Sequence, residues 1–440
     1  MNNSPSRFFQ FVARLFFALT ILLMPFRFRL VLWERPFFPI YSDYTDFLFY
    51  ASDFSLLFML TFWAAYLIIE PRKVSVGNKF LWVLLVGLTL SGWLSALGSV
   101  DPVITQYHAV RFTGLLFFYL YIVNEVSSVI GVVIPVGLQG LLQAPVALGQ
   151  SLLQSSLGLQ AFGEHVLDPQ VLGTSIIPIA SGRFLRAYGL TDHPNILGGC
   201  LAFVLVILWT TVMTGKSKGR IALAAIAFVF MFPALLLTFS RSAWVGLFVA
   251  VGFLLMSTVY LKDWRALKLS FLICAFSLAA SLPFLIGHFS VFNQRINSGN
   301  VAEDQPMNER AYLLNAGNTL FVEHSAIGVG LGASPLAMKL RFENFRVNFQ
   351  PPHFIPLLSA LETGVVGGIF YFLLSMVPFI LFLLRWRKYM LHPPVLGTIA
   401  LLFAITMVNL FDYYTWMYAP GRLWQWLAWG LYSTALEKAG

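Results

Sequence analysis

Long apolar stretches alternate with short polar connections along the whole chain. A helix needs about 20 apolar residues to cross the hydrocarbon core of a bilayer. Approximately twelve stretches meet that length, at residues 8–25, 47–69, 79–98, 105–123, 128–148, 192–213, 220–239, 242–260, 268–287, 355–384, 394–411 and 421–436. Glycine, glutamine and proline interrupt the fifth, which leaves open that this helix is broken. The pattern predicts an all-α polytopic membrane protein forming one integral membrane domain over residues 1–440.

Two connections are too long for tight turns, residues 149–191 and 288–354. Loops of this length in a compact protein are usually functional. In the second, which precedes the tenth predicted span, residues 309–323 carry apolar side chains at near-helical spacing and predict an amphipathic helix. Those apolar residues are Tyr312, Leu313, Ala316, Leu320 and Val322. Such a helix would lie on the membrane surface or cap the bundle.

The run Gly328-Val-Gly-Leu-Gly332 follows that predicted helix. A dinucleotide-binding glycine loop follows a strand and opens a helix within a βαβ unit. Neither neighbour is predicted here, so the run is interpreted as a tight turn and not as a nucleotide site.

Composition supports the membrane assignment and excludes other classes. The chain is 58% hydrophobic and only 11% charged, whereas soluble domains carry about 25% charged residues. The formal charge of +9 could suggest nucleic acid, but the 28 basic residues are spread between apolar blocks and form no basic patch. No nucleic-acid partner is therefore predicted. Cys200 and Cys274 lie in apolar stretches without the spacing of a zinc site or a disulfide framework.

Lysine and arginine residues predict the orientation, because they concentrate in short cytoplasmic loops. Alternate connections hold Arg72, Lys73 and Lys79; Lys216, Lys218 and Arg220; Lys262, Arg265 and Lys268; and Arg385, Arg387 and Lys388. With twelve helices, these clusters and both termini lie on the cytoplasmic side of the cytoplasmic membrane. The two long connections then face the periplasm or the exterior. The exception is a group in the first outer connection, Arg27, Arg29 and Arg35.

Asp53 and Arg111 lie inside predicted spans, where unpaired charges are costly. A structural ion pair between them is the preferred interpretation, with proton relay or substrate contact as alternatives. Asp43 and Asp46 could suggest a metal site against a diphosphate, but no further ligand is evident nearby. No metal and no other cofactor is predicted.

Several motifs together resemble the O-antigen ligase and Wzy-like polymerase superfamily. Over roughly residues 180–435 these motifs occur in order: Arg186-Ala-Tyr-Gly-Leu-Thr-Asp-His-Pro-Asn195, Phe239-Ser-Arg241, Arg310, Gly328-Val-Gly-Leu-Gly332, His353, Glu362-Thr-Gly-Val-Val-Gly367 and Asp412-Tyr-Tyr-Thr-Trp416. The resemblance implies transfer of a glycan from undecaprenyl diphosphate to an acceptor hydroxyl on the outer side of the membrane. The acceptor would be a lipid, a glycan or a protein.

The resemblance also implies roles for individual residues. Arginine binds phosphate oxygens bidentately and stays charged, so Arg186 and Arg241, with Arg310 as a third member, are expected to clamp the diphosphate. His353 is expected to be the general base, because histidine accepts a proton near neutral pH. The family usually has Asn after this histidine, whereas Phe354 follows here.

Three further residues are candidate substrate contacts, His193, Asn195 and Glu362. For the segment that holds the first two, a structural interpretation stands beside the functional one: Asp192 caps a helix whose first turn contains Pro194. Glu362 lies about 13 Å along the same predicted helix from His353, too far to orient it within that helix.

Other functions remain open at this point. A polymerase of the same superfamily would differ from a ligase only in its acceptor, and the helix count slightly favours a ligase. A polytopic lipid or solute transporter is an alternative that would not need a structured outer loop of this length. A non-catalytic scaffold for envelope assembly would tolerate replacement of His353.

Overall fold

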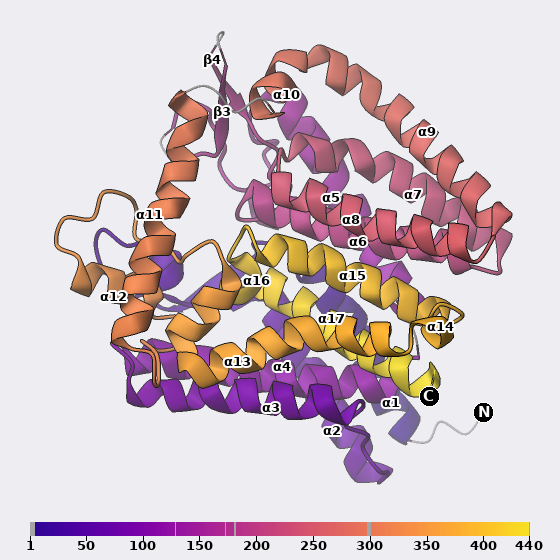
Figure 1. Cartoon of the computed structure of the whole chain (residues 1–440), viewed down its shortest axis with the longest axis horizontal. Helices are drawn as coiled ribbons and strands as arrows, with labels where there is room; N and C mark the ends of the chain where they lie inside the picture. The colour runs from indigo at the N-terminus through magenta and orange to yellow at the C-terminus, as the bar shows by residue number, and fades with distance from the viewer. Residues whose placement is uncertain (1–4, 128, 172, 180–181, 297–300, 440) are drawn as a thin grey trace.

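The computed structural model describes residues 5–127, 129–171, 173–179, 182–296 and 301–439. Its described part contains seventeen α-helices, α1 to α17 (Figure 1). Twelve of them occupy the predicted spans: α1 (Pro5–Leu23), α2 (Ala51–Ile69), α3 (Lys79–Leu94), α4 (Pro102–Glu125), α5 (Val133–Leu153), α6 (Pro194–Thr214), α7 (Lys218–Leu237), α8 (Arg241–Tyr260), α9 (Trp264–Gly287), α13 (Ile355–Leu384), α15 (Pro393–Asn409) and α17 (Ala419–Ala439). The other five are α10 (Phe289–Ile296), α11 (Val301–Glu323), α12 (Ser334–Arg341), α14 (Trp386–Tyr389) and α16 (Tyr414–Met417).

Nine segments within the described ranges are long and apolar enough to cross a membrane by their length and composition. They contain α1, α2, α3, α5, α6, α7, α8, α9 and α13. The remaining three predicted spans also form helices: α15 has 17 residues, and α4 and α17 are longer but less apolar. The predicted all-α polytopic membrane fold is confirmed.

The spanning helices lie side by side, and several of the other elements gather toward one end of the bundle. Figure 1 shows β3, β4, α11 and α12 toward the left of the view, α16 nearer the centre, and α14 with both chain termini at the right. We call the end at the left the loop end. α6 is the central helix, since 94% of its most apolar window is buried inside the protein. Its N-terminus points toward the loop end, which gives that end a rigid support.

Two small antiparallel hairpins, which the apolar pattern did not predict, complete the loop end. β1 (Arg29–Trp33) pairs with β2 (Phe47–Tyr50), and β3 (Ile176–Ile179) pairs with β4 (Gly182–Leu185). Short 3-10 helices also occur, at η1 (Ser42–Tyr44), η2 (Ser95–Leu97), η3 (Val129–Val132) and η4 (Gln160–Phe162). Strands of four or five residues are too short for an alternating pattern to distinguish them from loops.

The polar residues of α5 do not break the helix. Gln143 accepts a hydrogen bond from the Leu190 backbone N–H at 2.7 Å. Gln150 accepts from the backbone N–H groups of Tyr188 and Gly189, at 3.0 and 2.7 Å. A buried amide side chain is retained where it satisfies backbone groups. These glutamines therefore fix the loop that leads into α6.

The glycine run forms the predicted tight turn, and it docks against a kink in α13. Gly328, Gly330 and Gly332 have φ angles of 84°, 103° and 80°, which favour glycine. The helical run of α13 is interrupted at Gly364, with φ 73° and ψ 176°. The backbone N–H of Val329 donates to the carbonyl oxygen of Leu361 at 2.9 Å. The turn thus fixes the N-terminal part of α13, which begins two residues after His353.

Gly328→Ala is expected to destabilise the protein by ~3 kcal/mol, combining left-handed backbone strain with overpacking. An added Cβ would lie 2.6 Å from the backbone oxygen of Glu362. Gly158→Ala is the matched control, because Gly158 has nearly the same φ, +83°, and open space around it. Thermal unfolding in detergent measures both variants. Equal losses of stability in the two variants would mean that the contact with α13 does not contribute to the destabilisation by Gly328→Ala.

The amphipathic helix predicted at 309–323 is confirmed as the C-terminal part of α11, which packs on α13. Leu313, Ala316 and Leu320 are buried, as the spacing predicts. Val322 is 68% exposed and lies outside the buried face of the helix, although its apolar character suggested the same face. A residue two positions after Leu320 lies about 200° around the helix, on the opposite side.

Candidate functional site

Arg186 is buried at the loop end, just after β4, and its guanidinium has three acceptors. Nε donates to the Thr238 carbonyl oxygen at 2.8 Å, Nη1 to Ser175 Oγ at 2.9 Å, and Nη2 to Asn195 Oδ1 at 2.6 Å. These bonds join the β3–β4 hairpin, the end of α7 and the start of α6. Arg186 is therefore held in one orientation by three separate segments.

A second arginine, Arg295 at the end of α10, binds the same turn from the other side. Its Nε donates to the carbonyl oxygen of Phe239 at 3.1 Å. Phe239 has a φ of 49°, an uncommon conformation for a large residue, in the turn that leads into α8. That turn positions the predicted clamp residue Arg241, the first residue of α8. Sequence reasoning missed Arg295; its only signal was its place in a long loop.

Positive charge converges around Arg186. Burial, together with the neighbouring charges of Arg295 and Arg310, lowers the pKa of Arg186 to about 9. Tyr188 and Asp412 oppose that change. Arginine stays protonated in proteins, so the lowered pKa reflects a buried charge with two further cations nearby. We call Arg186, Arg295 and Arg310 the cation cluster. A bound anion would relieve their repulsion.

His193 is the N-cap of α6. Its Nδ1 accepts a hydrogen bond from the Asn195 backbone N–H at 3.1 Å, and Pro194 occupies the first helical turn. The prediction that Asp192 caps this helix is therefore wrong, because His193 is the cap. Burial and the charges of Arg186 and Arg310 lower the pKa of His193 to about 3. His193 is thus a neutral imidazole, and its Nδ1 bond assigns the ring proton to Nε2.

His353 lies just before α13, in edge contact with Tyr413; their ring centroids are 4.7 Å apart at 84°. Its Nδ1 is buried and has no hydrogen-bond partner among the described residues. Burial, together with the charges of Arg310 and His193, lowers the pKa of His353 well below the usual value. The ring is therefore neutral and keeps one nitrogen without a partner, as a proton acceptor requires.

Asn195 connects the cation cluster to a buried carboxylate. Its Oδ1 accepts from Arg186 at 2.6 Å, and its Nδ2 donates to Asp412 Oδ2 at 2.7 Å. Burial raises the pKa of Asp412, and the charge of Arg310 opposes that rise. The motif containing Asp412 contributed to the resemblance, but Asp412 was not identified as a site residue. Its position before α16 gave no indication that it contacts the start of α6.

A cavity of about 360 Å³ opens beside these residues. Most of its lining residues come from three separated segments, residues 41–44, 192–196 and 412–418, and Arg27, His165, Gly173 and Gln350 complete the walls. The volume falls in the range of small-ligand sites, about 300–1,000 Å³. His193, Asn195 and Asp412 line the cavity, whereas Arg186, Arg241, Arg310 and His353 are not among its lining residues. The cation cluster and the cavity therefore meet at the His193–Asn195 segment, since Arg186 binds Asn195 and both His193 and Asn195 line the cavity.

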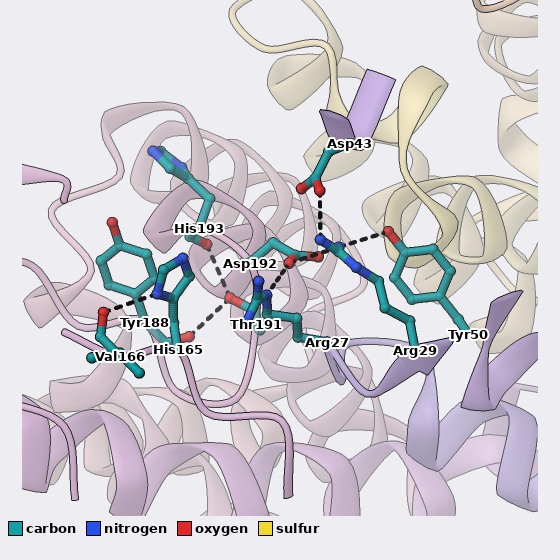
Figure 2. A network of polar contacts seen from close by, with 10 residues as sticks. All are labelled: Arg27, Arg29, Asp43, Tyr50, His165, Val166, Tyr188, Thr191, Asp192 and His193. Carbon is teal, nitrogen blue, oxygen red and sulfur yellow. Dashed lines mark hydrogen bonds and ion pairs between the residues drawn. The ribbon is translucent and has the colours of Figure 1, made fainter. Parts of the chain in front are cut away.

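Figure 2 shows how the arginines of the first connection are used. Arg27 Nε and Arg29 Nη1 both bind Asp192 Oδ1, at 2.7 and 2.8 Å, and Arg29 Nη2 binds Asp43 Oδ1 at 2.6 Å. Thr191 also binds the backbone oxygen of His193. Arg27 and Arg29 lie in a predicted outer connection, whereas most basic clusters lie in predicted cytoplasmic connections. Their ion pairs with Asp192 and Asp43 give a structural reason for this exception.

The remaining acidic candidates have structural partners. Glu362 is fully buried, and its carboxylate accepts from Gly332 N, Ser334 Oγ and Trp416 Nε1, each at 2.7 Å. It fixes the glycine turn and does not line the cavity, so the structure gives no support for Glu362 as a substrate contact. Asp53 Oδ1 pairs with Arg111 Nη2 at 2.8 Å, which is the preferred ion pair.

Asp43 and Asp46 do not converge. The first carboxylate binds Arg29, and the second accepts from the Arg35 backbone N–H at 2.6 Å. Within the described ranges there is no group of three or more His, Cys, Asp or Glu residues that could hold a metal ion. Both cysteines are free, with Cys200 buried and Cys274 exposed on α9.

The folded protein is expected to lose stability on acidification below about pH 6.5, the usual pKa of histidine. The pKa values of His193 and His353 are lowered in the folded state. Below pH ~6.5 the unfolded chain binds more protons than the folded protein does, so the free energy of unfolding falls as the pH falls. Each of these histidines contributes a loss of ~1.4 kcal/mol for each pH unit. The loss for His193 continues down to its folded pKa of about 3.

Thermal unfolding between pH 7 and pH 5 tests this expectation. His193→Asn, which can keep the helix cap, should have a shallower pH slope than the unsubstituted protein. The exposed His324→Asn is the control and should keep the full slope. Equal slopes for all three proteins would show that His193 titrates normally when folded.

Comparison with known protein families matches residues 226–372 to the family described as O-antigen ligase. The match covers about a third of the 440 residues, from within α7 to within α13. It includes Arg241, Arg310 and His353 and ends before Asp412. No curated protein matches the chain significantly. The family match confirms the resemblance to the O-antigen ligase and Wzy-like superfamily that the motifs indicate.

Proposed function

We propose that this protein, similar over its central third to O-antigen ligases, transfers a glycan from undecaprenyl diphosphate to an acceptor hydroxyl. One observation carries the proposal: the charge of Arg310, a member of the cation cluster, acts on the neutral His353. Arg295, Arg310 and His353 lie within the matched residues, and Arg186 lies outside them. A diphosphate leaving group needs countercharge, and an attacking hydroxyl needs a proton acceptor. The loop end supplies both.

The cation cluster would stabilise the diphosphate as its bond to the sugar breaks. Arg310 is suited to direct contact, because its charge acts on His353, His193 and Asp412 together. Arg186 has three protein acceptors, so it is suited to holding the segment and contributing charge. Arg241 would lie at the N-terminus of α8, where the helix dipole adds to its positive charge.

His353 would act as the general base. The acceptor oxygen forms a bond to the anomeric carbon of the glycan, and the bond from that carbon to the diphosphate oxygen breaks. The diphosphate leaves with the bonding electron pair, and the hydroxyl proton moves to the His353 ring. Arrival of the diphosphate would offset the positive charge of Arg310, which raises the pKa of His353 and makes it a stronger base. Arginine countercharge makes a metal unnecessary in this scheme.

The location of the site follows from the predicted orientation. With the basic connections and the termini in the cytoplasm, the loop end faces the periplasm or the exterior, where the lipid-linked glycan is presented. Surrounding membrane lipids would contact the exposed apolar faces, such as that of α9. A polymerase would use the same donor chemistry with another glycan as the acceptor.

Transfer of labelled glycan from undecaprenyl diphosphate by the purified protein in lipid, with EDTA present, tests the proposal. Turnover that depends on the acceptor and survives EDTA is expected. A transporter would instead move the lipid-linked glycan across the membrane without cleaving its diphosphate bond. Absence of cleavage, with transport retained, would contradict the proposed transferase.

A further inference from the structure

We infer that the cavity walled by residues 41–44, 192–196 and 412–418 binds an uncharged sugar ring of the glycan substrate. This inference rests on the proposed function and adds to it a specific place for the carbohydrate. The carbohydrate would come from the donor glycan or from the acceptor, and the experiment below distinguishes these two sources.

Aromatic rings supply the first part of the argument. Tyr41, Tyr44, Tyr413 and Tyr418 all line the cavity. The last three form a triangle with ring centroids 6.2 to 6.3 Å apart, and the Tyr44 and Tyr413 hydroxyls are hydrogen-bonded at 2.6 Å. Tyrosine offers an apolar face with a polar edge, which suits a sugar ring with C–H faces and peripheral hydroxyls.

Polar groups at the edge supply the second part. Asp43 Oδ1 binds Arg29 at 2.6 Å, whereas its Oδ2 has no hydrogen-bond partner among the described residues. The Asp43 side chain is 32% exposed, and Asp43 lines the cavity. A carboxylate oxygen accepts hydrogen bonds from hydroxyl groups, and a charged acceptor makes them stronger than neutral pairs. Gln350 adds an amide donor and acceptor to the same cavity.

Charge decides which part of the substrate fits here. Arg27 and Arg29 neutralise Asp192 and Asp43 on this side of the loop end (Figure 2). None of the three arginines of the cation cluster is among the lining residues of the cavity, and Arg186 is held by Asn195. A diphosphate is therefore favoured at the cation cluster, and an uncharged ring at the cavity. Tyr413 contacts His353 and lines the cavity, so a bound ring lies next to the proposed base.

Two variants test the cavity without disturbing the core. Tyr41→Ala removes a ring that is 48% exposed, and Asp43→Asn keeps the shape of the side chain while removing its charge. Tyr260→Ala is the control, because Tyr260 is 52% exposed and lies at the far end of α8. The probes are bare undecaprenyl diphosphate and the lipid-linked glycan isolated from the host, bound to the full chain in lipid nanodiscs.

The unsubstituted protein and Tyr260→Ala should bind the lipid-linked glycan more tightly than the bare lipid. If the ring belongs to the donor, Tyr41→Ala and Asp43→Asn should lose about tenfold in affinity for the lipid-linked glycan, which is ~1.4 kcal/mol, and keep their affinity for the bare lipid. If it belongs to the acceptor, both donor affinities stay unchanged and the KM for the acceptor rises about tenfold at constant kcat.

Unchanged donor affinities together with an unchanged acceptor KM in both variants would overturn the sugar subsite. Failure of the proposed function gives a different result, because the protein would then neither bind bare undecaprenyl diphosphate nor cleave the lipid-linked glycan. Tyr41→Ala should have the melting temperature of Tyr260→Ala, and a lower value would assign its effect to folding and also overturn the subsite. Asp43→Asn loses the ion pair with Arg29 and should melt lower, so its affinity for the bare lipid is the internal control for folding.

Discussion

His353→Ala is expected to lower turnover by about a hundred- to ten-thousand-fold, the usual contribution of a general base. Donor affinity should stay within about twofold, because the countercharge comes from arginines and not from this ring. The His353 ring is in edge contact with Tyr413, and its Nδ1 is buried without a partner among the described residues. Alanine removes the acceptor without exposing a buried partner. Single-turnover transfer and donor binding, measured separately, check the two parts.

His324→Ala is the matched control for this replacement, since His324 is exposed just beyond α11 and lies at the same end of the protein. Its turnover should equal that of the unsubstituted protein. The pH profile adds a second readout, because an acidic limb in kcat from the base should disappear in His353→Ala. Equal turnover of the two alanine variants would remove His353 from the mechanism and favour the scaffold alternative.

The apolar pattern predicted the helices well because a bilayer demands long apolar segments, whatever their tertiary contacts. It could not predict what interrupts them. The glutamines of α5 looked like a weakness, yet Gln143 and Gln150 hold the Tyr188–Leu190 backbone in place. Hydrogen bonds between segments far apart in the chain leave no periodic signal in either segment.

The candidate site was predicted only in part, for the same reason. Basic residues at the ends of predicted spans indicated Arg186 and Arg241, whereas Arg295 and Asp412 become site candidates only through their tertiary neighbours. Asp192 was interpreted locally as a helix cap, but two arginines from the first connection bind it instead. Charge pairing across more than a hundred residues overrides a local capping preference.

Glu362 shows how a motif residue can have structural partners that the sequence does not reveal. A carboxylate beside a helix kink looks functional in sequence, because buried acids are costly. Here three donors satisfy it, and it connects the turn at Gly332 to α13 and to Trp416. Its importance would then be to position the helix that follows His353, which the sequence alone could not separate from direct contact.

Arg310→Ala is expected to weaken donor binding by about ten- to a hundredfold, the value of one charge-assisted contact of ~1.5–3 kcal/mol, while leaving the melting temperature unchanged. Arg310 is half-buried on α11, and its charge acts on His353, His193 and Asp412. Arg341→Ala is its control, because Arg341 is an exposed arginine of α12 that pairs with Glu323. Equal donor affinities for Arg310→Ala and Arg341→Ala would exclude Arg310 from the clamp.

Arg186→Ala should differ from Arg310→Ala by losing both donor affinity and stability. Removing the guanidinium leaves the Thr238 carbonyl, Ser175 Oγ and Asn195 Oδ1 without their donor. Unsatisfied buried polar groups cost about 1–3 kcal/mol each, so a loss of ~3 kcal/mol or more is expected. Arg186→Lys restores the charge but not the three-way fork. If the charge of Arg186 acts on the diphosphate, Arg186→Lys should recover donor affinity more than stability. If Arg186 only positions Asn195, Arg186→Lys should recover neither donor affinity nor stability.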